Sequence, residues 1–368
     1  MTVKSLEDLL DAPQFTYSES DRNENLVPLL HDLTAHHRAN CAIYESLSEA
    51  GGLPNPVSTG TASIPYLPVR SFKELELKSV PDEDVVKVLT SSGTTGQSVS
   101  KIYLDAANAT LQQKALSSIM RTILGDERLP MLIIDAPSLL KNRATFSARG
   151  AGVLGMMTFG RAHTWILNDD MQLDRDVLNA FLATYGSERF LIFGFTFMAW
   201  KYLCQQVATN EVDLSNGILV HSGGWKKLES ESVTTEVFNQ TWLEKTGLSK
   251  THNFYGMVEQ IGSVFVEGPD GWLYCPNFAD IIIRNPVDWS IQAPGVPGVI
   301  EVISALPTSY PGHALLTEDL GIAEPAPANS KWKGTRFRVL GRLPKAELRG
   351  CSDTHAAQQD LLQTQGQR

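Results

Sequence analysis

Cysteine is scarce in this chain, which has four in 368 residues: Cys41, Cys204, Cys275 and Cys351. They are far apart in the sequence and form no C-x-x-C pair, so neither a zinc site nor a disulfide framework is indicated. Three of them lie in apolar or helical surroundings, where buried and inert thiols are expected. Cys351 differs because it lies close to the C-terminus, in the segment Leu348-Arg349-Gly350-Cys351-Ser352-Asp353.

Long apolar runs and an excess of positive charge are also missing. No stretch of about 18 uncharged apolar residues occurs, and Met1–Asp8 lacks the apolar core of a signal peptide, so we expect a cytoplasmic protein with no membrane partner. The 31 Lys and Arg residues are outnumbered by 41 Asp and Glu residues, which gives a formal charge of −10. This balance argues against a nucleic-acid partner, although a local basic cluster could still bind phosphate.

The common P-loop pattern G-x-x-x-x-G-K-[ST] is absent as well. In its place, Thr90-Ser91-Ser92-Gly93-Thr94-Thr95-Gly96 follows the apolar-rich stretch Val85–Leu89, where a strand is expected to end. Glycine lets backbone N–H groups approach an anion closely, and Ser and Thr hydroxyls can donate to phosphate oxygens. The stretch therefore predicts a phosphate-binding loop, with a surface turn of small polar residues as the alternative.

Apolar periodicity predicts helices first and alternating strands and helices later. Leu26–Tyr44 has apolar residues at helical spacing, so residues 1–50 are expected to be helical. From about residue 85 to about residue 305, apolar runs alternate with amphipathic stretches, which implies a parallel sheet covered by helices. The expected strands are Met131–Ile134, Phe190–Phe195 and Gly217–Val220, and the expected helices are Asp174–Tyr185 and Glu229–Lys245.

After residue 270 the pattern changes to short strands separated by Gly and Pro turns. Asp280–Arg284 and Gly298–Ile303 are the clearest examples. Such spacing predicts a smaller and more antiparallel subdomain. The tail after Thr354 is expected to be mobile.

Three histidines, His31, His36 and His37, lie within the first expected helix. A metal site is one interpretation, but no acidic or cysteine partner stands at ligand spacing. We therefore favour histidines on a helix surface.

Three downstream segments complete a pattern that begins at the hydroxyl-rich loop. His252-Asn253-Phe254-Tyr255-Gly256-Met257-Val258-Glu259 places an aromatic residue and a glycine before a glutamate, Leu316–Gly321 contains Asp319, and Gly341-Arg342 is a Gly-Arg pair. With Ser91–Gly96, these segments resemble, in the same order, the signature segments of the acyl-adenylate-forming superfamily. That superfamily includes acyl-CoA synthetases, firefly luciferase and peptide-synthetase adenylation domains. Four such segments in family order are hard to obtain by chance.

The resemblance implies a phosphate site and a metal site. Adenylation joins a carboxylate to the α-phosphate of ATP, so positioning and electrostatics supply most of the catalysis. Glu259 would be catalytic and would hold Mg²⁺, because this hard cation takes carboxylate oxygen and shares it with substrate phosphates. Lys101 is a further catalytic candidate as a phosphate partner, with a solvated strand lysine as the alternative. The loop residues that would hold the β- and γ-phosphates are Ser91, Ser92, Gly93, Thr94, Thr95 and Gly96.

The resemblance also implies where the nucleoside binds. Tyr255 would stack on adenine and Gly256 would leave room for the ring, with a core tyrosine as the alternative. Asp319 would accept the ribose hydroxyls and Arg342 would pair with ribose or phosphate. Glu318 stands where many relatives have glycine. For Glu318 and Asp319, the alternative is an exposed acidic turn. The segment expected to border the adenine after the third strand is Ser222, Gly223 and Gly224.

The implied fold is α/β: a large adenylate-forming-type N-terminal domain, with parallel sheets covered by helices, plus a small β-rich subdomain. The expected division is a helical segment at 1–60, an α/β nucleotide- and acyl-binding core at 61–270, the β-rich subdomain at 271–342 and a short C-terminal segment at 343–368 with Cys351. Gly150–Gly160 and Gly194–Trp200, rich in Gly, Met and Phe, are expected to line the acyl pocket. Ordinary helix–sheet packing is the alternative for both.

Few residues follow Arg342, whereas typical superfamily members continue into a swinging C-terminal domain with a catalytic lysine. We expect that domain to be truncated here. The ending Gly341–Cys351 resembles the acyl-protein synthetases, or long-chain-fatty-acid–protein ligases, of bacterial bioluminescence fatty acid reductase complexes. This closer resemblance covers nearly the whole chain from about residue 60.

In that branch the enzyme takes the acyl group from acyl-AMP onto its own C-terminal cysteine and passes it to a reductase subunit. The resemblance therefore implies that Cys351 is a catalytic acyl acceptor. Arg349 and Lys345 could lower the pKa of its thiol, and His355 could act as base. An idle surface thiol is the alternative.

The predicted activity is that of an ATP-dependent acyl-protein synthetase. With ATP and Mg²⁺ it would convert a carboxylic acid, expected to be a fatty acid, into acyl-AMP and transfer the acyl group to a thiol. The expected partners are that acid and an acyl-accepting protein, such as a reductase subunit or a carrier protein. The alternatives are an adenylate-forming ligase that uses CoA, a carrier protein or an amine, and a non-catalytic nucleotide-binding homologue.

Overall fold

The computed structural model describes residues 5–50, 53, 59–91, 99–140, 148–225 and 232–343. These residues form two compact units. The first contains the described residues up to Ile123 and from Gly256 onward, and the second contains Leu124–Tyr255. The first unit is thus assembled from two separate parts of the chain. The four segments predicted along the chain stay a prediction.

The second unit contains the parallel sheet that the strand–helix alternation predicts. Its strands pair in parallel in the order β8-β7-β6-β4-β5, so their carboxyl ends meet at one edge. The predicted strand Phe190–Phe195 is confirmed as β6, whereas β7 continues past the expected Val220 to Ser222. The strands are β4 (Leu129–Ile133), β5 (Gly160–Trp165), β6 (Phe190–Phe195), β7 (Gly217–Ser222) and β8 (Thr251–Tyr255).

Side-chain caps mark the starts of α7 and α9 in the second unit. Asp174 accepts a hydrogen bond from Val177 N at the start of α7, and Thr234 caps α9 in the same way. Gly247 ends α9 with a φ of 72°, a left-handed conformation that glycine adopts without strain. The predicted helix Glu229–Lys245 is confirmed from Thr235 onward, residues 232–234 are not helical, and residues 229–231 lie outside the described residues. The helices are α6 (Ala148–Met157), α7 (Arg175–Tyr185), α8 (Thr196–Ala199) and α9 (Thr235–Thr246), with the 3-10 helix η3 (Pro137–Leu140) and the π-helix η5 (Trp200–Cys204).

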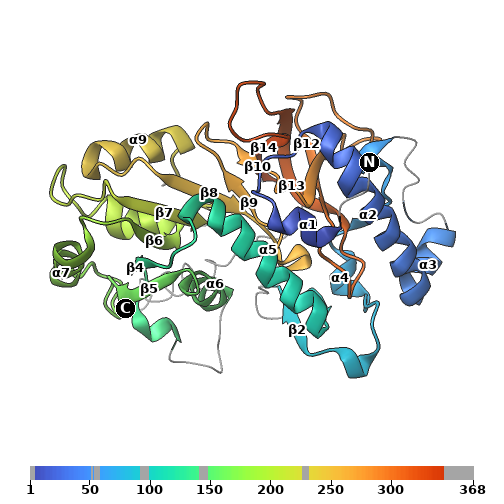
Figure 1. Cartoon of the computed structure of the whole chain (residues 1–368), viewed down its shortest axis with the longest axis horizontal. Coiled ribbons are helices and arrows are strands. Elements are labelled where there is room, and N and C mark those ends of the chain that lie inside the picture. The colour runs from blue at the N-terminus through green and yellow to red at the C-terminus, as the bar shows by residue number, and fades with distance from the viewer. Residues whose placement is uncertain are drawn as a thin grey trace, which may run out of the picture. The chain divides into compact units, whose positions relative to one another are not determined.

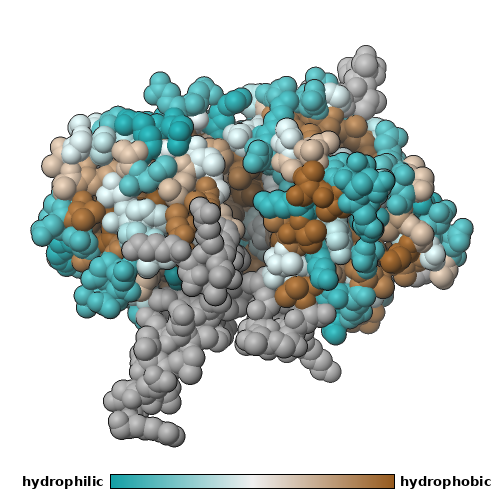
Figure 2. All heavy atoms as spheres, turned by 90° about the horizontal axis from the view of Figure 1, so that it is seen from below, coloured by the Kyte–Doolittle hydropathy of each residue, from teal (hydrophilic) through white to brown (hydrophobic). Residues whose placement is uncertain are grey.

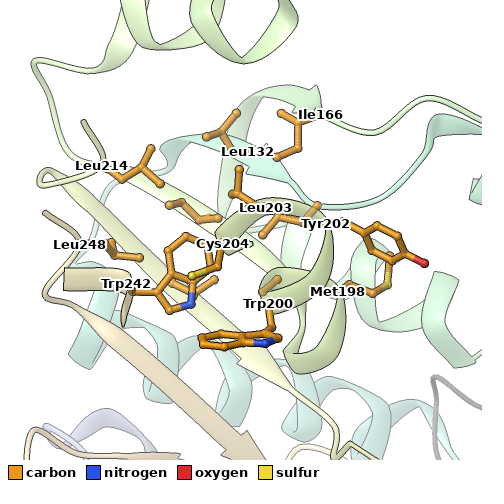
Figure 3. Close-up of a cluster of buried hydrophobic side chains, with 14 of the residues drawn as sticks. Leu132, Ile166, Met198, Trp200, Tyr202, Leu203, Cys204, Leu214, Trp242 and Leu248 are labelled. Carbon is orange, nitrogen blue, oxygen red and sulfur yellow. The ribbon is translucent and has the colours of Figure 1, made fainter. Parts of the chain in front are cut away.

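The core of the second unit lies between its sheet and the helices α7, α8 and α9, and contains η5 (Figure 3). Trp242 and Leu203 are fully buried, and the rings of Trp200 and Phe238 stack with centroids 5.6 Å apart. Cys204 lies in the same cluster, where burial raises the pKa of its thiol to about 12. Cys41 and Cys275 are also buried, which confirms the prediction of inert thiols for these three cysteines.

The first unit is mostly antiparallel in its C-terminal part, as the short strands after residue 270 predict. Strands pair in the order β11-β12-β13-β14-β10-β9, and β1 adds to β13 in parallel. A separate antiparallel hairpin joins β2 to β3. The strands are β1 (Leu67–Pro68), β2 (Lys87–Thr90), β3 (Lys101–Leu104), β9 (Phe265–Glu267), β10 (Leu273–Tyr274), β11 (Ala279–Arg284), β12 (Gly298–Ser304), β13 (Ala314–Pro325) and β14 (Thr335–Arg342).

N-terminal helices cover this antiparallel sheet. Leu26 and Leu30 of α2 pack into one buried cluster with Ile303 of β12, so the two parts of the chain share a core (Figure 1). Ser5 and Ser18 start α1 and α2 with capping boxes, and Cys41 separates α2 from α3 within the helix expected over Leu26–Tyr44. The helices are α1 (Leu6–Asp11), α2 (Glu19–Asn40), α3 (Ala42–Glu49), α4 (Ser71–Glu74) and α5 (Ala106–Leu124), with the 3-10 helices η1 (Gly60–Ser63), η2 (Asp82–Asp84) and η7 (Val258–Gln260).

The prediction of surface histidines on α2 is wrong for His37. Its side chain is fully buried, with Nδ1 at 2.8 Å from Ser79 Oγ and Nε2 at 3.0 Å from the Pro307 carbonyl oxygen. Its ring stacks on His313, whose Nε2 lies 2.9 Å from Thr34 Oγ1. No group of three or more His, Cys, Asp or Glu side chains among the described residues is arranged to hold a metal ion.

His313→Gln should make stability less sensitive to acid. Burial lowers the pKa of His313 to about 3, and burial together with His313 lowers the pKa of His37 well below 6.5. The unfolded chain therefore takes up these protons first, and the free energy of unfolding falls as the pH drops from about 6.5 towards about 3. Removing one ring should reduce that slope by up to about 1.4 kcal/mol per pH unit.

Urea unfolding at several pH values between about 7 and about 5 measures this slope. Glutamine keeps a polar nitrogen near the position of Nε2, so the contact with Thr34 can survive the substitution. His31→Gln on the exposed side of α2 is the matched control. If the free energy of unfolding changes with pH by the same slope in wild type and in His313→Gln, the prediction is contradicted.

Hydrophilic and hydrophobic residues alternate over the face shown in Figure 2. Within the described part of the chain, none of the helices has both the length and the apolar character that a membrane span requires.

Candidate active site

The hydroxyl-rich loop connects the two strands of a short hairpin in the first unit. Ser91 N donates to the Ser100 carbonyl oxygen at 3.2 Å, and Ser100 N donates to Ser91 Oγ at 3.0 Å, so the loop is closed at its base. Lys101 follows on β3, opposite Thr90, with its side chain exposed. The other predicted phosphate-binding residues, Ser92, Gly93, Thr94, Thr95 and Gly96, lie outside the described residues.

Glu259 stands beside this hairpin on the short helix η7. The η7 helix lies against β3. Gln260 Nε2 ties η7 to the antiparallel sheet by donating to the carbonyl oxygens of Val302 and Gly312, at 3.1 and 2.8 Å. Glu259 itself is only 5% exposed, which is unusual for a carboxylate and requires polar neighbours.

The charge of Glu259 is set by opposing influences. Burial raises its pKa, the Ser100 hydroxyl and its own backbone lower it, Glu318 raises it and Arg342 lowers it. The net result is a raised pKa, because desolvation is the largest of these effects. A cation bound beside Glu259 would stabilise the carboxylate and reverse this shift.

The predicted ribose residues lie on paired strands. Asp319 on β13 and Arg342 on β14 are direct partners in the antiparallel register. Arg342 Nε donates to Asp319 Oδ1 at 3.1 Å, and an Arg342 Nη donates to Glu318 Oε2 at 3.4 Å. Thr317 Oγ1 accepts a hydrogen bond from Asp319 N at 3.1 Å and donates one to the Ile300 carbonyl oxygen. These bonds link the backbone at Asp319 to β12.

Five predicted site residues lie in the first unit. Asp319 and Arg342 are joined by a hydrogen bond, and Ser91 and Lys101 lie on the hairpin whose strand β3 contacts the η7 helix of Glu259. Glu318 and Arg342 are the two charged side chains that influence the pKa of Glu259, with opposite effects. With Glu318, these five residues carry three carboxylates, one guanidinium and one ammonium group. The carboxylates among the described residues do not form a three-ligand metal site by themselves, so a cation here would need further ligands such as substrate phosphates.

The predicted adenine segment lies at the carboxyl edge of the parallel sheet in the second unit. Ser222 ends β7, and Gly223 follows with a φ of +83°, a conformation that would strain any L side chain. Trp225 packs edge-on against Trp200, with ring centroids 6.1 Å apart, so it is a partly buried aromatic of the core margin. Tyr255 is half-buried at the end of β8, and the exposed Gly256 follows it in the chain.

Two polar residues that the sequence interpretation missed lie at the same strand ends. His221 and Asn253 are partners in the β7–β8 register. His221 Nδ1 contacts Thr196 Oγ1 at 2.9 Å, while His221 Nε2 and Asn253 Oδ1 are buried without a hydrogen-bond partner. Burial, followed by the influence of His252, lowers the pKa of His221 to about 3, so the ring is neutral. Buried polar atoms without a hydrogen bond at the end of a parallel strand indicate a candidate ligand site. This feature depends on the surrounding structure, so the sequence does not reveal it.

The two segments predicted to line the acyl pocket, Gly150–Gly160 and Gly194–Trp200, give little evidence for that role. Phe197, Met198 and Ala199 are buried in the core cluster of the second unit, which is the packing role left open by the sequence. The glycines Gly150, Gly152 and Gly155 have G-x-G-x-x-G spacing but lie inside α6. A dinucleotide fingerprint needs that spacing in a strand-to-helix turn, so these glycines do not form one.

Comparison with known proteins identifies the family of the chain. The family model described as "Acyl-protein synthetase, LuxE" matches residues 2–359. The chain belongs to this family. The long-chain-fatty-acid–luciferin-component ligase of Aliivibrio fischeri is 24% identical over 296 residues, which cover 78% of this chain and 77% of that protein. The ligase of the same name from Vibrio harveyi is 21% identical over 328 residues, covering 86% and 83%.

A solved structure supports the fold. The 2-hydroxyisobutyryl-CoA ligase, crystallised in an open conformation with 2-HIB-AMP and CoA, matches with a TM-score of 0.66 and 15% identity. The match covers 90% of this chain and 77% of that one. The α/β fold of the adenylate-forming type is therefore confirmed. Family and fold together make the chain an ATP-dependent ligase that activates and transfers acyl groups, as the sequence predicts.

Proposed function

We propose that this family member activates a fatty acid, the substrate class in the names of its curated relatives, with ATP and Mg²⁺ and transfers the acyl group to a protein thiol. The observation that carries the proposal is the buried Glu259 beside the Asp319–Arg342 pair, at the base of the hydroxyl-rich loop. A buried carboxylate with a raised pKa is a costly feature, which a bound cation would stabilise. Asp319 and Arg342, the proposed ribose-binding pair, lie in the same unit as Glu259, which fits a site for a nucleoside triphosphate.

The nucleoside roles follow from acceptor chemistry. An ionised carboxylate has about four acceptor positions. Asp319 can therefore keep its contact with Arg342 and still accept the two ribose hydroxyls.

The reaction has two steps. A carboxylate oxygen of the acid attacks the α-phosphorus of ATP, and the bond from that phosphorus to the bridging oxygen breaks, which releases pyrophosphate. Mg²⁺ at Glu259 would neutralise charge on the phosphate oxygens. A thiolate then attacks the acyl carbon and AMP leaves, so the acyl group ends as a thioester.

Cys351 is the proposed thiol. The residue lies outside the described residues, and the proposal rests on its place near the C-terminus and on the family resemblance. The other three cysteines are buried in the cores of the two units, where burial raises the thiol pKa of Cys204 and Cys275. Thiols of this kind are poor nucleophiles. The final acceptor would be a reductase subunit or a carrier protein.

A panel of carboxylic acids read by pyrophosphate release tests the function. Fatty acids of graded chain length are compared with short, aromatic and amino acids, each with ATP and Mg²⁺. Release that depends on a long-chain acid supports the proposal. Release with none of the acids would leave a nucleotide-binding homologue, and release only in the presence of CoA or an amine would identify a different acceptor.

Asp319→Ala should weaken ATP binding by at least about 10- to 100-fold, because even one hydrogen bond to a charged group contributes about 1.5–3 kcal/mol. Glu318→Gln removes the neighbouring charge but keeps Asp319, so it is the matched control. Isothermal titration of ATP measures both. Unchanged affinity in Asp319→Ala would show that the ribose assignment is wrong.

A further inference from the structure

A buried ion pair in the second unit has no part in the site described above. Asp135 follows β4 at the carboxyl edge of the parallel sheet, and Arg149 lies in the first turn of α6. Arg149 Nε and Asp135 Oδ2 are 3.3 Å apart, and the two side chains are 12% and 2% exposed. Ligands of open α/β sheets bind outside the carboxyl ends of the strands, which is where this pair lies.

The pair is incompletely satisfied. Asp135 Oδ1 accepts from Ala136 N at 2.8 Å, but Asp135 Oδ2, Arg149 Nε and an Arg149 Nη are buried without a hydrogen bond. The two groups are close, yet the guanidinium N–H groups are not directed at the carboxylate. Burying charges is costly unless hydrogen bonds satisfy them, so this arrangement does little for stability and points to a ligand.

The chemistry of the ligand follows from the open positions. The pair carries no net charge. An anionic ligand would be repelled by Asp135 Oδ2, and a cationic ligand would be repelled by Arg149. One open acceptor stands beside open N–H donors. A neutral group that both donates and accepts matches them, and a hydroxyl on a ligand is such a group.

The surroundings of the pair are apolar. Val153 and Met156 on α6 are buried. A Cβ on Gly152 would lie 3.4 Å from Phe195 Cζ, so α6 and the end of β6 are in close contact. These residues belong to the two segments expected to border the acyl group, and Arg149 immediately precedes the first of them.

We propose that Asp135 and Arg149 recognise a hydroxyl group on the acyl chain, so that the substrate class is hydroxylated carboxylic acids. This inference rests on the proposed function. The hydroxyl oxygen accepts from an Arg149 N–H, and the hydroxyl hydrogen is donated to Asp135 Oδ2. An unsubstituted chain leaves these polar groups unpaired in an apolar environment and should therefore react with a lower kcat/KM.

The test compares matched acids. Octanoate is assayed against its 2-, 3- and 8-hydroxy derivatives, and benzoate against its hydroxy derivatives, each at saturating ATP with pyrophosphate release as the readout. We expect one hydroxylated acid to exceed its parent by at least about 10-fold in kcat/KM. Equal or higher kcat/KM for every parent acid would overturn the inference.

Variants then assign the preference to the pair. Asp135→Leu combined with Arg149→Met replaces the pair by apolar side chains of similar size and should abolish the preference for the hydroxyl, with the parent acid as good or better. The exposed pair Arg161–Glu188 in the same unit, 3.1 Å apart, gives the matched control Arg161→Met with Glu188→Leu, which should retain the preference. If the apolar variant does not fold, Asp135→Asn, which keeps one acceptor oxygen, is read by the same ratio of acids. A preference unchanged in the Asp135 variants would overturn the assignment.

The two hypotheses fail differently. If wild type releases no pyrophosphate with any acid, the proposed function is wrong and the inference falls with it. If wild type releases pyrophosphate with fatty acids but ignores hydroxyl groups, the function stands and only the role of Asp135 and Arg149 is wrong.

Discussion

Glu259→Gln is expected to lower the rate of pyrophosphate release by about 100-fold or more, while the dissociation constant of ATP changes by less than about 3-fold. Glutamine keeps the shape of the side chain but removes the charge that would hold Mg²⁺. The nucleoside would still be held by residues on other elements, such as Asp319 on β13. Pyrophosphate release across a magnesium titration measures the first effect, and calorimetric titration of ATP measures the second.

The pH dependence of wild type gives an independent check on Glu259. Without a bound metal its pKa is raised, chiefly by burial, so protons should compete with Mg²⁺ for the carboxylate. At a limiting magnesium concentration, the rate should therefore fall as the pH drops through that raised value. Glu318→Gln removes a neighbouring carboxylate that raises the pKa of Glu259, so it should move this fall to lower pH. Equal rates for wild type and Glu259→Gln at all magnesium concentrations would exclude the metal assignment.

Cys351→Ser is expected to abolish accumulation of a hydroxylamine-labile acyl-protein while leaving acyl-AMP formation intact. Adenylation needs the nucleotide site, whereas acyl capture needs only a reachable nucleophile. A serine hydroxyl is a far weaker nucleophile than a thiolate at neutral pH. Incubation with labelled acid and ATP, followed by denaturing electrophoresis with and without hydroxylamine, reads the thioester, and pyrophosphate release reads adenylation.

Ser352→Ala is the matched control for Cys351→Ser, because it changes the adjacent residue and keeps the thiol. The three other cysteines are buried, so label on the wild-type protein should map to the C-terminal peptide. A thioester that persists in Cys351→Ser would rule this residue out. An unlabelled wild-type protein that still releases pyrophosphate would favour direct transfer to CoA or a separate protein.

Much of the fold could be predicted from local patterns. The unbroken apolar run Phe190–Phe195 predicts a strand buried on both faces, and β6 has these bounds. Asp174 before the apolar periodicity of 175–185 predicts the start of α7, and its side chain caps that helix. Such features need only neighbouring residues. The break at Cys41 and the burial of His37 could not be read in this way, because packing against other elements decides both.

Some residues of the candidate site could be predicted from the sequence, and others are found only in the structure. Spaced motifs single out Ser91, Glu259, Asp319 and Arg342 as residue types able to bind a nucleotide and a cation. Their roles remain proposals. No motif reveals that His221, Asn253, Asp135 and Arg149 carry buried atoms without a hydrogen bond, because an unsatisfied polar group is a property of what surrounds it.

The sequence by itself determined the superfamily-type motifs, the branch and the order of strands and helices, because these depend on residue identity and on periodicity along the chain. Only the tertiary structure decided which residues meet. The antiparallel register places Asp319 opposite Arg342, Gln260 anchors the buried Glu259 beside the hairpin that carries Ser91, and Asp135 and Arg149 face each other with hydrogen bonds unmade. Burial and partner geometry set the charge state and the binding capacity of these groups, and both arise only when distant parts of the chain pack together.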